Sequence, residues 1–381
     1  MKEKIKNILK KNSFFYSIYR IVGSFFINVI KVFVKTDNKL ILFVSYGGRY
    51  FNDSPKCIYD RMKNDKRFSE YKLVWAFINP KEFKNVDSVK IDSFAYYVLA
   101  LKARAWITNV IVERGLKFKG KNTFYYHTTH TTLPKLMGND TINKKVFGSN
   151  YKYFYDESCA QSDYERQLQT SMFGIEIEKI NNFGYPKNDS LLETFDEEKI
   201  KRELGIQKNK KIILYAPTYR ENNSSTMVSL VNFDKWKSVL GEGFVILFRA
   251  HPTVVNMTDL SKYKGFMIDV STYQDNTELM KISDVLVSDY SGIFFEYAIL
   301  DKPMFCFAYD YEEYEKSRGL YFDIRKELSG GMLLEDEFLK ELKNFDSEKN
   351  RMIALNFKNK YVTYYGNATE KSVDEIFKRI N

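Results

Sequence analysis

The stretch "VLVSDYSGIFFEYA", from Val285 to Ala298, joins one apolar run to another through a short polar break. Residues DVLVS are typical of a buried strand, and IFFEYAIL places its apolar residues at helical spacing. The break brings Ser288, Ser291 and Gly292 to the start of the helix, where free backbone N–H groups and the helix dipole attract anions. The stretch therefore predicts a strand, a phosphate-binding turn and a helix. Capping of the helix by Ser291 is the alternative that needs no ligand.

Two further residues of this turn have separate expected roles. Gly292 lacks a side chain, so a ligand can approach its backbone closely. Asp289 carries a charge that repels phosphate, so we expect its carboxylate to accept hydrogen bonds from backbone amides or ligand hydroxyls.

The same alternation of strand-like and helical segments recurs along the chain. A turn-rich join, "NNFGYPKNDSL" at 181–191, separates two such sets. Strands that alternate with helices form parallel sheets, so the sequence predicts an α/β fold with two Rossmann-like domains facing a central cleft. We expect an N-terminal segment at 1–37, a first domain at 38–185, a second domain at 186–367 and a closing helix at 368–381.

Composition narrows the class of protein. The 381 residues suffice for two domains, and the net charge of +10 favours an anionic partner such as nucleic acid, phospholipid or a phosphorylated substrate. No helix-turn-helix, RNA-binding or basic-tail signature accompanies that charge, so no nucleic-acid partner is expected. The three cysteines are scattered, which disfavours a disulfide framework or a zinc site. The chain also lacks a complete GxGxxG, a Walker lysine signature and a GxSxG motif, which disfavours nicotinamide enzymes, P-loop ATPases and common hydrolases.

The N-terminus is basic and then rich in apolar and aromatic residues from Phe14 to Val34. Arg20, Gly23 and Lys31 interrupt this stretch, whereas a spanning helix needs about 20 nearly uninterrupted apolar residues. No small-residue cleavage site of a signal peptide follows. We therefore expect a basic amphipathic segment lying on an anionic membrane surface, with a helix packed on the domain core as the alternative.

Histidine is rare, and each of the three histidines follows a predicted strand. His127 and His130 belong to the first domain and His251 to the second. Ligands of open α/β sheets bind beyond the carboxyl ends of the strands, so these side chains are candidates for a shared cleft. A histidine can take a hydroxyl proton or donate to a phosphate, although a lone histidine is more often structural.

Polar and cationic residues follow other strands in the same way. Thr218 and Arg220 end the run "YAPTYR", and Arg249 follows the next strand, which predicts contacts with phosphate oxygens. For either arginine alone, a surface ion pair is the alternative. In the first domain, Gly47 and Gly48 repeat the order of strand, glycine turn and helix.

Together these segments resemble the CDP-glycerol glycerophosphotransferase family, the teichoic acid primases and polymerases of Gram-positive bacteria. The resemblance runs from about Lys39 to the C-terminus. The usual HGTPLK motif of the family reads HTTLPK here, from His130 to Lys135, so its glycine is lost and its Leu and Pro are exchanged. The resemblance rests on SPKCIYDRM, HTTLPKLMG, CAQSDYERQ, FGYPKNDSL, YAPTYR, RAHP, VSDYSGIFFEYAILDKPMFCFAYDYEEY and RGLYFD.

The resemblance implies a GT-B arrangement with the CDP-linked donor in the C-terminal domain and the acceptor in the N-terminal domain. His130 is then the expected base for the acceptor hydroxyl, and His251 the expected partner of the CMP leaving group. We expect Glu296 to accept from ribose hydroxyls, with a solvated helix glutamate as the alternative. The acceptor side is expected to include Gly47, Gly48 and Lys135, and the expected pyrophosphate contacts are Thr218, Arg220, Arg249, Ser288, Asp289, Ser291 and Gly292.

Several partners and alternatives follow from the same reasoning. The donor is CDP-glycerol or CDP-ribitol, and the acceptor is an undecaprenyl-linked saccharide or a poly(alditol phosphate). No obligate cofactor and no protein metal site are expected, although a Mg²⁺ ion can accompany the nucleotide. We expect a peripheral protein on the cytoplasmic face of the cell membrane. A GT-B glycosyltransferase for capsule or wall polysaccharide and an inactive membrane scaffold are the other candidate functions, and the oligomeric state is left open.

Overall fold

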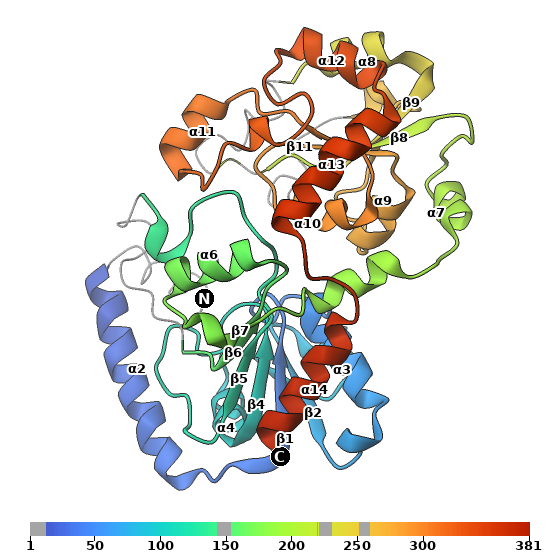
Figure 1. Ribbon diagram of the computed structural model, residues 1–381. Helices are drawn as coiled ribbons and strands as arrows, with labels where there is room; N and C mark the ends of the chain where they lie inside the picture. Colours follow the sequence, from blue (N-terminus) through green and yellow to red (C-terminus); the bar gives the residue numbers. More distant parts are fainter. Residues whose placement is uncertain (1–12, 143–153, 219, 221–230, 251–259) are drawn as a thin grey trace.

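Two parallel sheets organise the computed structural model, which describes residues 13–142, 154–218, 220, 231–250 and 260–381 (Figure 1). The N-terminal sheet has the order β3-β2-β1-β4-β5-β6-β7 and the C-terminal sheet the order β10-β9-β8-β11-β12. Every strand pair in these sheets is parallel, which confirms the predicted α/β class and the GT-B-like pair of Rossmann-like domains. The strands are β1 Asp37–Val44, β2 Lys72–Phe77, β3 Ser88–Lys90, β4 Ala103–Thr108, β5 Phe124–His127, β6 Glu157–Cys159, β7 Ile180–Asn181, β8 Lys211–Tyr215, β9 Phe244–Phe248, β10 Met267–Asp269, β11 Val285–Ser288 and β12 Met304–Cys306.

Helices cover both faces of each sheet, so each sheet separates two apolar clusters. Because both faces are buried, the strands are continuous apolar runs, and Val285, Leu286 and Val287 of β11 are all 0% exposed. The helices are α2 Ser13–Phe33, α3 Asp53–Lys63, α4 Phe94–Lys102, α6 Asp163–Phe173, α7 Glu197–Glu203, α8 Phe233–Leu240, α9 Asn276–Ile282, α10 Ile293–Tyr297, α11 Tyr311–Arg318, α12 Glu335–Lys343, α13 Ser347–Tyr361 and α14 Ala368–Ile380.

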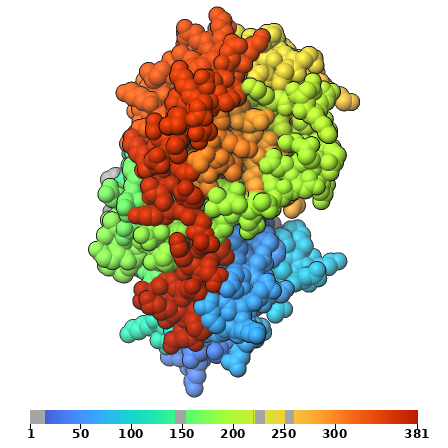
Figure 2. Space-filling view, turned by 45° about the vertical axis from the view of Figure 1, so that its right-hand side comes forward, coloured from blue at the N-terminus to red at the C-terminus, as the bar shows by residue number. Residues whose placement is uncertain are grey.

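The last helix, α14, returns to the N-terminal domain after the chain has completed the C-terminal one. Val373, Ile376 and Ile380 of α14 enter the same apolar cluster as the β1 residues Ile41 and Phe43. The C-terminal part of the chain therefore runs as a red band over both domains (Figure 2). Helix α14 at the end of the chain therefore packs on the N-terminal domain and connects it to the C-terminal one.

The N-terminal end of α14 is capped by the segment that first crosses between the domains, the short helix η5 Pro186–Leu192. The Asp189 carboxylate of η5 accepts hydrogen bonds from the backbone N–H groups of Ala368 at 3.0 Å and Thr369 at 2.7 Å. A carboxylate at a helix N-terminus satisfies orphan N–H groups and complements the dipole. The two crossings of the chain are therefore bonded to each other.

Helix α2 lies along the N-terminal domain on one face and is exposed on the other (Figure 1). Ser24 Oγ accepts from the Lys117 backbone N–H at 2.9 Å, and Asn28 donates to the Lys117 carbonyl at 2.6 Å. The residues 15–33 are long and apolar enough for a membrane span, but these contacts hold the helix along the domain. The outer face carries Ile21, Phe25, Phe26, Val32 and Phe33, each more than 60% exposed. The expected basic start of this segment, 1–12, lies outside the described residues.

Candidate functional site

A cleft of about 2700 Å³ separates the two domains and is lined by both of them. Its residues follow the carboxyl ends of strands: Tyr46 comes after β1, His130 after β5, Thr218 after β8 and Arg249 after β9. Parallel strands bring their carboxyl ends to one edge of a sheet, which is where open α/β folds bind ligands. The sequence-based placement of His130, Thr218 and Arg249 at one cleft agrees with the geometry.

The turn after β1 has a strained backbone. Tyr46 and Asp53 adopt φ values of 44° and 65°, in the left-handed region that is costly for residues other than glycine. The Tyr46 hydroxyl donates to Asp53 Oδ2 at 2.8 Å, which orients the carboxylate. Such strain costs of order 1–3 kcal/mol per residue and is typical of functional sites.

Gly47 and Gly48 serve this turn but do not line the cleft, contrary to their expected place on the acceptor side. Both are buried and have positive φ values of 65° and 85°. A Cβ atom at Gly48 would lie 3.1 Å from the Ala76 carbonyl oxygen, so glycine is needed for packing on β2. Their neighbours Tyr46 and Arg49 line the cleft instead.

His130 presents a neutral imidazole to the cleft. Its Nδ1 lies 3.3 Å from the Asn109 carbonyl oxygen, and a carbonyl can only accept, so Nδ1 carries the hydrogen and Nε2 the lone pair. Burial lowers the pKa of His130, and the charge of Lys187 lowers it further, against the opposing effect of Asp53. The ring is therefore suited to accept a proton at Nε2.

The neighbouring His127 is structural. It is buried, its ring stacks on Tyr155 at 4.7 Å between centroids, and its Nδ1 accepts from the Thr129 backbone N–H at 3.2 Å. Burial lowers the pKa of His127 to about 3, so it stays neutral. The other predicted catalytic histidine, His251, lies outside the described residues, and its role stays a prediction.

An ion-pair network at the cleft was not foreseen from the sequence. The Lys187 ammonium lies 2.8 Å from Glu296 Oε1 and 3.6 Å from Asp53 Oδ2, and donates to the His130 carbonyl oxygen at 2.5 Å. Burial alone would lower the pKa of Lys187, but Glu296 and Asp53 raise it above its ordinary value. Lys187 lies in the motif FGYPKNDSL, but nothing in that motif indicates its two carboxylate partners.

Glu296 is therefore not a solvated helix glutamate. Its side chain is 12% exposed and pairs with Lys187. Burial raises the pKa of Glu296, and the ammonium of Lys187 opposes this rise. The expected contact with ribose hydroxyls stays a prediction.

Arg249 is a cleft-lining cation of the C-terminal domain that is available to an anion. Its Nη1 donates to the carbonyl oxygens of Val270 and Tyr273, both at 2.9 Å. Burial lowers the pKa of Arg249, and within the described ranges this guanidinium forms no salt bridge. A cleft-lining cation without a carboxylate partner is suited to phosphate oxygens.

Arg220, in contrast, is already paired within the protein, and its expected contact with the pyrophosphate stays a prediction. Its guanidinium bonds Asp310 at 2.7 and 2.9 Å and Asp289 at 2.9 Å, and lies over the rings of Tyr290 and Tyr314. The buried Asp289 and the partly buried Asp310 therefore both pair with its charge. Asp289 also accepts from the Thr218 backbone N–H at 2.8 Å, as the sequence predicted for backbone amides.

The Thr218 hydroxyl is available to a ligand. Its Oγ1 is buried, and it has no hydrogen-bond partner in the part of the chain that the structure describes. The residue lines the cleft, and a buried hydroxyl without a partner is costly unless a ligand or water satisfies it.

The turn from β11 to α10 differs from the predicted phosphate loop. Ser288 is 0% exposed and its hydroxyl donates to the Ala216 carbonyl at 2.5 Å, so it cannot reach a ligand. Ser291 Oγ accepts from the Ile293 backbone N–H at 3.3 Å, which is the capping alternative. Helix α10 has only 5 residues, so its dipole is small. Ser291 and Gly292 do line the cleft, and their contact with phosphate stays a prediction.

Gly292 has a different reason to be glycine. A Cβ atom there would lie 2.6 Å from the Thr132 carbonyl oxygen and 1.9 Å from the Thr131 hydroxyl oxygen, both in the N-terminal domain. The space on the side of Gly292 where a Cβ atom would point is therefore occupied by the other domain. Gly292 permits close contact between the domains beside His130.

A backbone bridge strengthens this contact between the domains. Residue Lys135 forms an isolated antiparallel bridge with Leu320, Leu136 N–H donates to the Gly319 carbonyl at 3.0 Å, and Tyr321 N–H donates to the Pro134 carbonyl at 2.7 Å. The motifs HTTLPKLMG and RGLYFD therefore meet across the domain boundary. Lys135 lines the cleft, as its expected place on the acceptor side requires.

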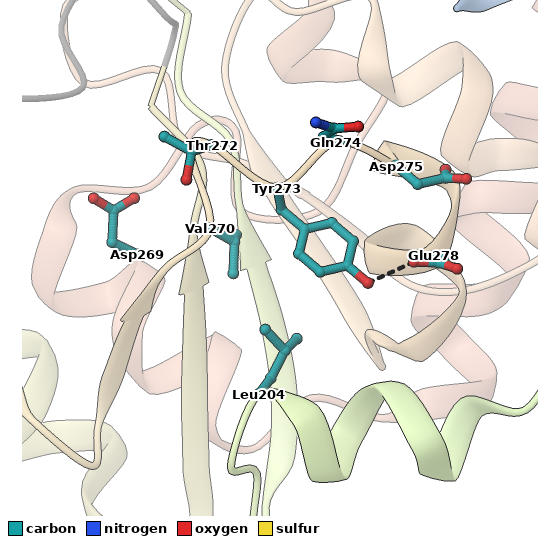
Figure 3. A pocket seen from close by; sticks show the side chains of 8 residues that line it. All are labelled: Leu204, Asp269, Val270, Thr272, Tyr273, Gln274, Asp275 and Glu278. Carbon is teal, nitrogen blue, oxygen red and sulfur yellow. Dashed lines mark hydrogen bonds between the residues drawn. The ribbon is translucent and has the colours of Figure 1, made fainter. Parts of the chain in front are cut away.

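A smaller pocket of about 450 Å³ shares residues 272–275 with the cleft (Figure 3). The Tyr273 side chain points to Glu278 and donates a hydrogen bond to it at 2.5 Å. Asp269, Asp275 and Glu278 give this pocket a negative charge, which repels phosphate. An anionic ligand therefore fits the cleft near Arg249 better than the smaller pocket.

Sequence comparison identifies relatives along nearly the whole chain. A family described as CDP-Glycerol:Poly(glycerophosphate) glycerophosphotransferase matches residues 26–378. A teichoic acid glycerol-phosphate transferase of Staphylococcus aureus is 32% identical over 403 residues, covering 98% of this chain and 100% of that relative. A teichoic acid poly(glycerol phosphate) polymerase of Staphylococcus epidermidis is 36% identical over 341 residues, which are 82% of this chain and 47% of the polymerase.

Structural comparison agrees with these relatives. The wall teichoic acid polymerase TagF, solved as a histidine-to-asparagine variant with CDPG, superposes with a TM-score of 0.79 at 30% identity. The match covers 91% of this chain and 90% of that chain, so it includes both domains and the cleft between them.

Proposed function

The chain belongs to the CDP-glycerol:poly(glycerophosphate) glycerophosphotransferase family, and from this premise we propose that it transfers glycerol phosphate from CDP-glycerol to a hydroxyl group of a membrane-linked acceptor. Glycerol-phosphate transfer in teichoic acid synthesis is the activity of this family. The proposal is carried by one observation: the neutral His130 of one domain and the Arg249 cation of the other line the same cleft.

The reaction forms one phosphorus–oxygen bond and breaks another. The acceptor hydroxyl oxygen attacks the phosphorus of the glycerol phosphate, its proton passes to His130 Nε2, and CMP leaves with the bridging oxygen. Phosphoryl transfer depends mainly on positioning and charge neutralisation. Arg249 and Thr218 are the proposed contacts of the pyrophosphate, with the backbone amides at Ser291 and Gly292 beside them. His251 is the proposed partner of the CMP leaving group.

In this proposal Arg249 supplies positive charge from the protein, no protein-held metal ion is included, and a Mg²⁺ ion would enter with the nucleotide. Across the residues that the structure describes, no group of three or more His, Cys, Asp and Glu residues is arranged to hold a metal.

The acceptor is proposed to be an undecaprenyl-linked saccharide or a poly(alditol phosphate), reached at the cytoplasmic face of the membrane. Support comes from the exposed apolar face of α2, whose opposite face is bonded to the N-terminal domain. A helix held along a domain in this way fits an orientation parallel to the membrane surface, with its apolar side chains in the headgroup region.

The test measures CMP release from CDP-glycerol and from CDP-ribitol, and UDP release from a UDP-sugar, in separate reactions with a lipid-linked acceptor. The proposal predicts CMP from CDP-glycerol together with extension of the acceptor by glycerol phosphate. CMP from CDP-ribitol alone would change the donor, and sugar transfer from the UDP-sugar would refute the phosphotransferase assignment.

A further inference from the structure

Lys187 connects the two domains beside His130. Its ammonium pairs with Glu296 of the C-terminal domain at 2.8 Å and with Asp53 of the N-terminal domain at 3.6 Å. It also donates to the His130 carbonyl oxygen at 2.5 Å. The side chains of Lys187, Glu296 and Asp53 are 16%, 12% and 6% exposed, so solvent screens these charges weakly.

The backbone of Lys187 is fixed as well as its side chain. Its N–H donates to Ser54 Oγ of α3 at 3.3 Å, and its carbonyl oxygen accepts from Ser190 Oγ at 2.9 Å. Asp189, two residues later in η5, caps α14. The Lys187 side chain therefore extends from a backbone that is fixed by hydrogen bonds, so its ammonium cannot move with one domain independently of the other.

The charges explain why a lysine is needed at this point. Asp53 and Glu296 are two carboxylates in a poorly solvated cleft, and Lys187 is the cation that both contact. Removing the cation would leave both carboxylates buried without their partner, which is strongly unfavourable. The same removal would leave the His130 carbonyl without this donor.

We propose that Lys187 is a positioning residue, which ties the His130 backbone to Glu296 and so fixes the imidazole relative to the donor-binding domain. This inference rests on the proposed function, because it takes His130 as the base. Lys187 itself touches no reacting atom. Its effect on catalysis comes from the placement and the charge of His130.

Lys187 also affects the protonation of His130. Among the described residues, the charged or titratable groups around the imidazole are Tyr46 after β1, whose ring packs edge-on against it, Asp53 at the start of α3, Lys187 in η5, Lys135 in the His130 loop and His127 in β5. Among these, Lys187 and Lys135 lower the pKa of His130 and Asp53 raises it. Loss of the Lys187 charge is therefore expected to move the acidic limb of the pH profile to higher pH.

The test compares K187M with K358M in the full-length protein. Lys358 is a matched control, because its side chain is 9% exposed and pairs with Asp301 at 2.7 Å, and neither residue lines the cleft. For K187M we expect kcat for CMP release to fall by about 100-fold, the cost of a misplacement of order 1 Å, while the Kd for CMP changes less than about threefold. The acidic limb of the kcat/KM profile should move to higher pH. K358M should keep the wild-type kcat and pH limb.

The variants E296Q and K187M/E296Q test the link between the domains. If Lys187 acts through Glu296, the double variant should be no slower than K187M. The inference would be overturned if the kcat losses of K187M and E296Q multiply in the double variant. It would also be overturned if K187M leaves the acidic limb of the pH profile unmoved, or lowers kcat and CMP affinity equally. If the wild type releases no CMP from CDP-glycerol, the proposed function fails on its own. Hydrogen exchange at residues 130–133 then decides the inference: faster exchange in K187M than in K358M supports it, and equal exchange refutes it.

Discussion

Replacing Gly292 by alanine tests whether contact between the domains sets the geometry of the cleft. Gly292 has φ −65° and ψ −12°, which alanine adopts without strain, so any effect must come from the added methyl group. That methyl carbon would lie 2.6 Å from the Thr132 carbonyl oxygen. Thr131 can rotate its hydroxyl away, but the Thr132 backbone cannot rotate.

The expected size of the effect follows from this contact. An ordinary carbon–oxygen contact is at least 3.4 Å, so the two domains must separate locally by about 0.8 Å. Overpacking of this kind costs about 1–3 kcal/mol of stability. A displacement near 1 Å between the base and the donor costs up to about 100-fold in rate. We therefore expect G292A to lose between about 10-fold and 100-fold in kcat.

The assay is CMP release from CDP-glycerol, combined with urea unfolding. G243A is the matched control, because a Cβ atom at Gly243 meets no atom within 4 Å. Wild-type kcat and stability in G292A, equal to those of G243A, would refute the argument that the domains meet at this glycine.

The remaining predictions concern the arginine at the tyrosine cluster, the base and the N-terminal helix. R220M should lose about 3–5 kcal/mol of unfolding free energy in urea, because the buried Asp289 and the partly buried Asp310 lose their guanidinium partner. Wild-type stability with weaker CDP-glycerol binding would instead support the expected phosphate role of Arg220. Burial lowers the pKa of His130, and the base works when it is deprotonated, so the acidic limb of the wild-type kcat/KM profile should lie below pH 6.5. A limb above that pH would contradict the assignment of His130 as the base. F25S/F26S should weaken binding to anionic vesicles by at least about tenfold, since Phe25 and Phe26 are each more than 60% exposed. The control L334S should bind as the wild type does, because Leu334, although 78% exposed, lies on the other domain. Equal binding by F25S/F26S and the wild type would exclude the outer face of α2 as the contact.

Local sequence patterns predicted the elements and the edge at which the cleft forms. The change from DVLVS to IFFEYAIL marks β11 and α10 because burial and helical spacing leave a local pattern. His130, Thr218 and Arg249 could be placed at one cleft because the carboxyl ends of parallel strands share an edge.

The partners of charged side chains could not be predicted in this way. Arg220 follows β8 like a phosphate ligand, but its partners Asp289 and Asp310 lie 69 and 90 residues away in sequence. Lys187 likewise finds Glu296 across 109 residues. Gly292 was interpreted as an approach for a ligand, whereas the neighbouring backbone belongs to the other domain. Tertiary packing selects these partners, and no local periodicity records it.

In the proposed mechanism the base lies in the N-terminal domain and the donor site in the C-terminal one. The most direct test measures CDP-glycerol binding and CMP release in H130N, using protein with the wild-type unfolding profile. The account predicts a Kd for CDP-glycerol within about threefold of the wild type and a loss of 10²- to 10⁴-fold in CMP release, as for removal of a general base. CMP release at the wild-type rate, or loss of donor binding in parallel with activity, would contradict it.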